Sequence, residues 1–145
     1  MQHVHIVGSD LERLEQIAAT FRGDGWTTSV STKTIALWEM LREWVGRQPY
    51  EPLAVIVVAE GDADLDPEGL FEVATKLRQP FVCEPHIAVG VLTSAIRECI
   101  LIGSDVVEEF DTPPEKMLRP MRAALEDRER RRDRLRAYEA QPPYE

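Results

Sequence analysis

The chain has 145 residues, 43% of them hydrophobic, and carries 26 acidic against 17 basic side chains for a formal charge of −9. This length fits one domain, and the acidic excess argues against nucleic-acid binding, which depends on neutralising phosphates. Cys83 and Cys99 have neither disulfide-framework nor zinc-site spacing, and no segment has the pattern of a signal peptide or a membrane span, so we expect a cytoplasmic protein.

Five short apolar runs alternate with segments of helical periodicity, which is typical of a parallel sheet with helical crossovers. The predicted strands are 3–7, 27–30, 53–58, 86–92 and 106–109. The run at 53–58, Leu-Ala-Val-Ile-Val-Val, has no polar alternation. It is therefore expected to be the central strand, buried on both faces.

The first two predicted helices follow the first two strands. Ser9-x-x-Glu12 is a capping box that fixes the start of the first helix, and Gly23 and Gly25 follow its end. Each helix has a stripe of apolar residues that we expect to face the core: Leu11, Leu14, Ile17 and Phe21 in the first, and Ile35, Trp38, Leu41 and Val45 in the second.

Proline and glycine delimit the next two predicted helices. Asp66-Pro67 places an N-cap before a proline at the first helical position, and this third helix runs to Pro80. The fourth runs from about Ser94 to Gly103, a residue suited to a C-cap. Both helices are short, as is usual for crossovers between parallel strands.

The last predicted helix begins near Pro113 and continues to about residue 140, with Pro120 expected to kink or divide it. Strict alternation of five strands and five helices favours an α/β fold, a flavodoxin-like doubly wound parallel sheet of order 2-1-3-4-5 with an extended C-terminal helix. We expect one domain over residues 1–125 and a charged helical extension with a short tail over 126–145.

In such a sheet, ligands bind beyond the carboxyl ends of the strands. The residues that follow the strands are therefore the candidate site: Gly8, Ser9 and Asp10, residues 59–66, Thr93 and Ser94, and Phe110 and Asp111.

Several segments, taken in order, resemble the receiver domain of bacterial response regulators over roughly residues 3–125. These segments are Val4-His5-Ile6-Val7, Lys76-Leu77-Arg78-Gln79-Pro80 leading to residues 86–94, Gly103-Ser104-Asp105, which is similar to the family's Gly-Ala-Asp, and Phe110-Asp111. The resemblance implies phosphorylation of an aspartate at the end of the third strand. It also implies Mg²⁺ held by an acidic pair after the first strand, with a Thr or Ser and a Lys contacting the phosphoryl oxygens.

Carried over by position, the acidic chemistry of that family is missing from this chain. The acidic pair falls on Gly8 and Ser9, with only Asp10 following. The phosphate acceptor falls on Val58 or near Gly61, and no aspartate occupies positions 58–61. Two or three carboxylates are needed to hold a hard cation, so we expect no metal and no cofactor.

Of the other two phosphate-contacting positions, one matches the family and one does not. Thr93 matches the family's hydroxyl residue, whereas the lysine falls on Glu109 or Phe110, neither of which can donate to a phosphate. The sequence therefore predicts a non-catalytic pseudo-receiver, a signalling or regulatory module that works by protein–protein contact and is not an enzyme.

Two alternatives remain open. The chain could be a phosphorylatable receiver with displaced acids, Asp10 and either Asp62 or Asp64, acting with Thr93. It could also be a flavodoxin-like small-molecule-binding domain, although its first strand–helix turn has only one glycine and no phosphate-binding fingerprint. Glu60 is either an ordinary loop acid or a mimic of a phosphorylated aspartate.

The distribution of charge suggests where a partner binds. Residues 1–118 carry 9 basic and 20 acidic side chains, whereas residues 119–145 carry 8 basic and 6 acidic ones. By resemblance, we expect a protein partner or a homodimer to use the fourth helix, fifth strand and fifth helix. The candidate contact residues, including a tryptophan expected at the edge of the second helix's apolar face, are Trp44, Ile100, Val107, Met117, Met121, Arg128, Arg132 and Leu135.

The histidines and the fourth-helix cysteine are expected to be structural. His3 and His5 are two apart on a strand and so share a face, whereas His86 begins a strand that is not adjacent. Cys99 lies in a short apolar helix, where a small packing residue is the ordinary role.

Overall fold

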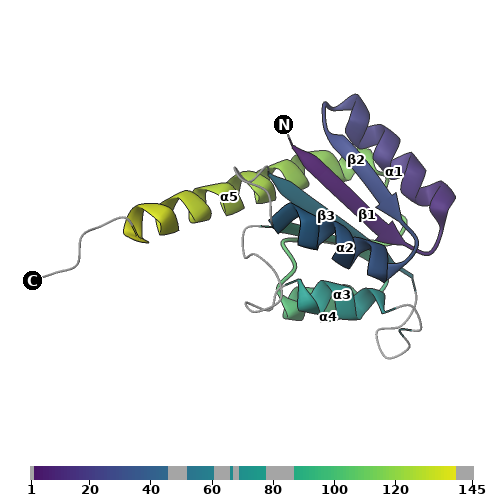
Figure 1. Ribbon diagram of the computed structural model, residues 1–145. Helices are drawn as coiled ribbons and strands as arrows, with labels where there is room; N and C mark the ends of the chain where they lie inside the picture. The colour runs from purple at the N-terminus through teal and green to yellow at the C-terminus, as the bar shows by residue number, and fades with distance from the viewer. Residues whose placement is uncertain (1, 46–51, 61–65, 67–68, 78–86, 140–145) are drawn as a thin grey trace, which may run out of the picture.

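The computed structural model describes residues 2–45, 52–60, 66, 69–77 and 87–139 (Figure 1). All five strands form one parallel sheet of order β2-β1-β3-β4-β5, which confirms the predicted fold. The strands are β1 His3–Gly8, β2 Thr27–Ser31, β3 Leu53–Ala59, β4 Ala88–Thr93 and β5 Val106–Glu109. The helices are α1 Leu11–Gly23, α2 Thr34–Val45, α3 Leu70–Lys76, α4 Ile96–Ile102 and α5 Glu115–Glu139.

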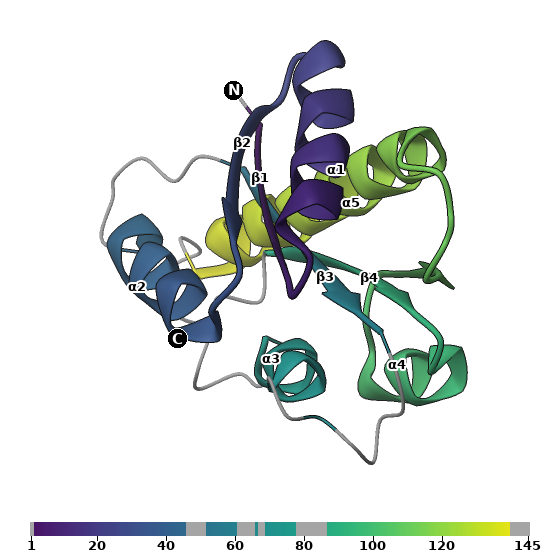
Figure 2. The same cartoon turned by 90° about the vertical axis from the view of Figure 1, so that its right-hand side faces the viewer.

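Helices cover both faces of the sheet, with α1 and α5 on one face and α2, α3 and α4 on the other (Figure 2). Each face therefore has its own apolar core. All seven residues of β3 are buried, which confirms that this strand is central. Its uninterrupted apolar sequence satisfies both cores at once.

The helix starts differ in detail from the predicted ones. The N-cap of α1 is Asp10, whose carboxylate accepts the backbone N–H of Arg13, so the predicted capping box at Ser9 is wrong by one residue. The N-cap of α3 is Gly69 and not Asp66, so that prediction is wrong by three residues. The carboxylate of Asp66 still accepts the N–H groups of Leu70 and Glu72 in the first turn. Both helix starts use aspartate because its short carboxylate reaches nearby amides.

The apolar face of α2 is rotated from the predicted one. Leu37, Leu41 and Trp44 are buried, and their spacing of four and three places them on one side of the helix. Ile35 lies about 200° from Leu37 around the axis and is exposed, so its predicted place in the core is wrong. Trp44 is 9% exposed and not at an exposed edge, which corrects that prediction too.

Helix α5 is continuous from Glu115 to Glu139, so the prediction that Pro120 divides it is wrong. Met117 and Met121, on either side of the proline, are both fully buried, and this packing keeps both sides of the proline on the sheet. Gly90 of β4 makes the approach possible, because a Cβ there would lie 2.4 Å from the sulfur of Met121.

Candidate functional site

The register of the parallel strands brings the predicted site residues to one edge of the sheet. Gly8 is the partner of Val58, Ala59 of Thr93, and Thr93 of Glu109. The positions predicted for the acidic pair, the acceptor, the hydroxyl and the lysine therefore follow one another across neighbouring strands. The positions carried over by resemblance are therefore adjacent, and what they can do depends on the side chains there.

The end of β3 presents no aspartate in the described residues. Val58 is buried in the core beneath α1 and α5, and Ala59 is buried in the core beneath the other three helices. Glu60, the next residue, is exposed. The remaining positions named for an acceptor or a displaced acid lie outside the described residues: Gly61, Asp62 and Asp64.

Asp10, the acid that follows β1, caps the first helix. Gly8 is buried, whereas Ser9 and Asp10 are exposed. Oδ1 of Asp10 lies 3.4 Å from the backbone nitrogen of Arg13 and caps the first turn of α1. A single carboxylate engaged at a helix N-terminus is a poorer cation ligand than an acidic pair, because hard cations take several oxygen ligands.

Thr93 is fully buried at the end of β4. Its hydroxyl oxygen accepts the backbone N–H of Ala95 at 2.9 Å, just before α4 begins. Burial raises the pKa of the Cys99 thiol, and a hydrogen bond with the Thr93 hydroxyl has a smaller, lowering effect. The predicted packing role of Cys99 is confirmed by its complete burial. Thr93 therefore contributes to the local structure of α4.

A cation reaches this edge from α1, which the sequence did not indicate. The guanidinium carbon of Arg13 lies 4.3 Å from the centre of the Phe110 ring, and its Nη2 donates to the Phe110 carbonyl oxygen. This contact joins the start of α1 to the segment between β5 and α5. Phe110 is half-buried, and Glu109 beside it is exposed. The position carried over for a lysine thus supports an arginine 97 residues away.

A surface cavity of about 300 Å³ lies beside this contact. The cavity is lined by the first turns of α1 and by the segment that leads into α5: Asp10, Glu12, Arg13, Gln16, Asp111, Thr112, Pro113 and Pro114. The carboxylates and the engaged arginine make it a mixed-charge surface, unlike the cationic cradle that a phosphate requires.

Strands β1 and β2 are joined along their length by a hydrogen-bonded histidine pair. Nδ1 of His3 lies 2.7 Å from the Thr27 hydroxyl and its Nε2 lies 2.8 Å from the Ser29 hydroxyl. Nδ1 of His5 lies 2.6 Å from the same serine and its Nε2 lies 2.8 Å from Ser31. His3 and His5 therefore have structural partners, as expected, whereas His86 lies outside the described residues.

The direction of this network follows from its end. The Thr27 hydroxyl donates to the carbonyl oxygen of Gln2 and so accepts from Nδ1 of His3. The Ser29 hydroxyl then donates to Nε2 of His3 and accepts from Nδ1 of His5, and the Ser31 hydroxyl donates to Nε2 of His5. In this direction each ring donates from Nδ1 and accepts at Nε2, so both rings are neutral. Burial, with a smaller contribution from His3, lowers the pKa of His5 to about 4. Within the described residues, no three His, Cys, Asp or Glu side chains could share a metal ion.

The predicted contact residues separate into buried and exposed groups. Met117 and Met121 are fully buried in the core, so their assignment to a partner surface is wrong. Ile100 on α4 is 59% exposed, and its neighbour Leu101, which the sequence reading missed, is 76% exposed. Val107 of β5 is partly buried and packs against the core.

Three contact candidates lie on the second half of α5. Arg128 is paired with Asp105 of the body, and only 13% of its side chain is exposed. The Arg132 side chain is 16% exposed and lies near Asp133. The side chain of Leu135 lies outside the described residues. The exposed part of the predicted face is therefore centred on α4.

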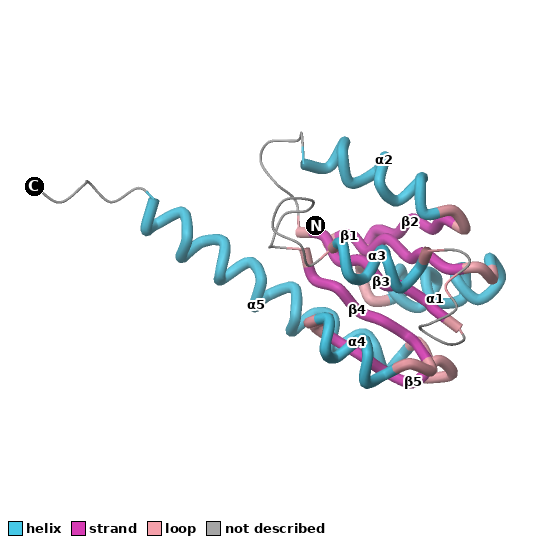
Figure 3. Tube along the Cα trace, turned by 90° about the horizontal axis from the view of Figure 1, so that it is seen from below, coloured by secondary structure: helices cyan, strands magenta, loops and turns pink. Residues whose placement is uncertain are grey.

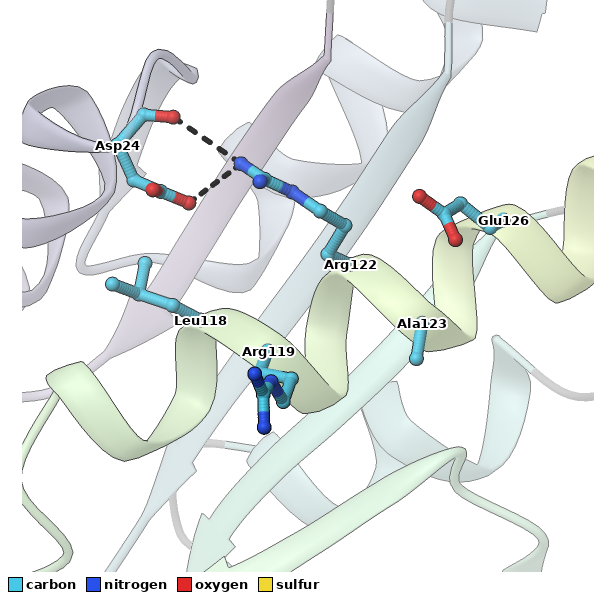
Figure 4. A pocket seen from close by; sticks show the side chains of 6 residues that line it. All are labelled: Asp24, Leu118, Arg119, Arg122, Ala123 and Glu126. Carbon is cyan, nitrogen blue, oxygen red and sulfur yellow. Dashed lines mark hydrogen bonds and ion pairs between the residues drawn. The ribbon is translucent and has the colours of Figure 1, made fainter.

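A second cavity, of about 290 Å³, lies between the end of α1 and α5 (Figure 4). Arg122 crosses it and donates to the carboxylate of Asp24 at 2.6 Å and to its carbonyl oxygen at 3.2 Å. Figure 4 shows Arg119 pointing away from Arg122, so the two guanidinium groups do not converge on a common ligand.

The sheet order and this edge define a receiver-like α/β domain, and solved structures agree. The chain is similar to NtrX from Brucella abortus in complex with ATP, with a TM-score of 0.72 and 11% identity over 99% of this chain and 31% of that one. It is similar to a response regulator receiver domain protein from Clostridium thermocellum, with a TM-score of 0.66 and 11% identity over 89% and 98% of the two chains. A CheY-like receiver domain protein from Methanospirillum hungatei gives 0.66 and 13% over 90% and 98%.

These neighbours show that the fold is that of response-regulator receiver domains. The chain spans about a third of the length of NtrX. No model of a known protein family matches the sequence, and no curated protein matches it. Among residues 2–45, 52–60, 66, 69–77 and 87–139, no helix is both long and apolar enough to cross a bilayer.

Proposed function

We propose that the protein is a non-catalytic receiver-like module that acts in signalling or regulation by binding another protein, without control by aspartate phosphorylation. The observation that carries this proposal is the edge of the sheet. Its acidic-pair position holds Gly8, the strand end holds Val58 and Ala59, and the Thr93 hydroxyl is engaged by the start of α4.

Phosphoryl transfer to an aspartate depends on a cation and on an ammonium or guanidinium group that neutralises the developing charge. Arg13 supplies the one guanidinium that bonds across this edge in the described residues, and it is bonded to Phe110. Its hydrogen bond and ring contact hold the segment after β5 against α1. This fixed contact favours a module that presents one surface over a module that switches with phosphorylation.

The surface we assign to the partner is the exposed side of α4. Ile100 and Leu101 are adjacent large aliphatic residues that are mostly exposed, whereas Cys99 beside them is fully buried. Aliphatic side chains gain free energy when a partner removes them from water. The neighbouring strand β5 adds half-buried Val107 and ends the sheet.

Partner capture with a matched control tests this assignment. Ile100→Gln with Leu101→Gln should abolish recovery of the partner from native extract, whereas Ile35→Gln should leave it intact. Ile35 is the appropriate control because it is 63% exposed but lies on α2. Equal recovery by wild type and the double variant would remove α4 as the contact surface.

Light scattering distinguishes a second copy from a different partner. A homodimer formed through the α4 surface should become monomeric in the Ile100→Gln, Leu101→Gln variant. A homodimer formed through the end of α5 should instead become monomeric when the chain stops after Arg128. If the full chain is monomeric, the partner of the proposed surface is another protein.

A further inference from the structure

The second half of α5 projects beyond the sheet (Figures 1 and 3). Met117, Met121 and Leu125 attach the first half of the helix to the core, and Leu125 is the last fully buried residue among the α5 side chains that the structure describes. Residues 128–139, which we call the arm, follow and contain six arginines. The match to NtrX covers 99% of this chain in the ATP complex and 90% in the ADP complex.

One ion pair joins the beginning of the arm to the body. Nη2 and Nε of Arg128 lie 2.5 and 3.1 Å from Oδ1 of Asp105. The two side chains are only 13% and 15% exposed. Largely buried charges of this kind require a partner, because desolvation penalises either one alone. The contact therefore constrains both the arm and the segment that carries Asp105.

Asp105 is held in place from its other side by β4. Its Oδ2 accepts the backbone N–H of Val89 at 2.8 Å, and its own N–H donates to the carbonyl oxygen of Val89 at 2.9 Å. It stands in the turn between α4 and β5, directly after Gly103 and Ser104. The carboxylate thus has one oxygen for the sheet and one for the arm.

Three other arginines of the arm make local contacts. Arg130 and Arg131 pair with Asp127, one turn before them on the same helix. Arg132 pairs with its neighbour Asp133 at 3.8 Å. Among these described contacts of the arm, the one from Arg128 to Asp105 joins the arm to the rest of the domain.

We propose that the Asp105–Arg128 pair is a latch that fixes the direction of the arm and couples it to the turn between α4 and β5. The coupling rests on the proposed function, because a partner on Ile100 and Leu101 would press on the helix that leads into Asp105. Displacement of that turn would move or break the pair, and the arm would then change direction or lose its attachment.

Hydrogen exchange of the isolated full chain tests the latch without a partner. Arg128→Gln should raise the exchange rates of amides in residues 129–139 by roughly tenfold or more, because the arm then opens independently of the body. Exchange in β1, β3 and β4 should change far less. Asp105→Asn should have the same effect on the arm while its side-chain oxygen can still accept the Val89 N–H.

Two variants serve as controls. Arg128→Lys keeps the charge but loses the second donor, so it should fall between wild type and Arg128→Gln. Arg122 lies on the same helix as Arg128 and forms a more exposed pair with Asp24. Arg122→Gln breaks that pair and should leave the arm unchanged. Equal exchange of the arm in wild type, Arg128→Gln and Asp105→Asn would overturn the latch.

The latch and the proposed function fail separately. Unchanged exchange in the isolated protein rejects the latch, whatever binds α4. If the latch is confirmed, exchange of the arm measured with bound partner tests the coupling, and unchanged rates on binding would reject it. Partner capture that ignores Ile100 and Leu101 would reject the proposed surface and leave the latch in place.

Discussion

The β1–β2 half and the β4–β5 half of the sheet, which we call its two sides, are stabilised by different interactions. On the β1–β2 side, a network of two neutral histidines and three hydroxyls lies between the strands. On the β4–β5 side, the fully buried Met117 and Met121 pack over Gly90, and the Asp105–Arg128 pair closes the turn. The first arrangement requires neutral side chains, whereas the second depends on apolar burial and on opposite charges.

This difference indicates which side is available for binding. The β1–β2 network uses its polar groups internally, and the ring of Trp44 lies 5.3 Å from that of His3. The β4–β5 side leaves the neighbouring Ile100 and Leu101 exposed together, whereas the exposed aliphatic residues of α1 and α2, Leu11 and Ile35, are far apart in the sequence. We therefore expect acid sensitivity on the β1–β2 side and partner contact on the β4–β5 side.

Met121→Ala should produce the largest loss of stability. The side chain is fully buried against β4, and shortening it leaves a cavity, so unfolding free energy should fall by about 2 to 5 kcal/mol. Urea denaturation followed by tryptophan fluorescence measures this loss. Met40→Ala, at a partly buried position on α2, is the control and should lose less. Equal losses would contradict the difference in burial between the two methionines.

Acid should weaken the β1–β2 side through His5. Because its folded pKa is about 4 and its unfolded value is 6.5, the unfolded chain binds the proton first as pH falls. Stability is therefore complete above pH 6.5 and declines as pH falls through the window from 6.5 to 4, by about 3 kcal/mol in total.

The His5→Asn variant isolates that contribution from other acid-sensitive groups. Its unfolding free energy should change less between pH 6.5 and 4 than that of wild type, measured by urea denaturation at each pH. Parallel curves for the two proteins would show that His5 does not have the lowered pKa.

Arg128→Gln tests the ion pair of the β4–β5 side. Removing the cation takes the guanidinium from Oδ1 of Asp105, and the expected loss is about 2 kcal/mol. Arg122→Gln should lose less than about 1 kcal/mol, because that pair is more exposed. Thermal or urea unfolding that ranks the two variants in the reverse order would contradict the account.

Replacing the aliphatic residues of α4 should have the smallest effect on stability. Ile100→Gln with Leu101→Gln should change the unfolding free energy by no more than about 0.5 kcal/mol, since neither side chain is in the core. Combined with the expected loss of partner recovery, this result separates binding from folding. A loss of several kcal/mol would show that these residues support the fold.

Much of the fold could be predicted from the sequence because local signals agreed with tertiary packing. β3 is apolar throughout and lies at the centre of the sheet, and Gly103 ends α4 with a φ of 97°. Trp44 lies outside the predicted apolar stripe of α2, because that stripe is centred on Trp38 and Leu41. The buried face is instead set by Leu37, Leu41 and Trp44.

The site was predictable in position but not in its contacts. Strand ends identified Gly8, Val58 and Thr93, and the register places them at one edge. Arg13 and Phe110 are 97 residues apart, and no periodicity or motif connects them. Met117 and Met121 were assigned to a surface by resemblance, although their helical spacing equally fits the core in which they lie.

The central claim is that this receiver-like fold does not accept a phosphoryl group on aspartate. The most direct test is incubation of the full chain with acetyl phosphate and Mg²⁺, followed by intact-mass measurement, beside a receiver that has its acceptor aspartate. The account predicts that only that control gains a phosphoryl group. A phosphorylated species of this chain that disappears in Asp10→Asn, Asp62→Asn or Asp64→Asn would contradict it and would establish a receiver with displaced acids.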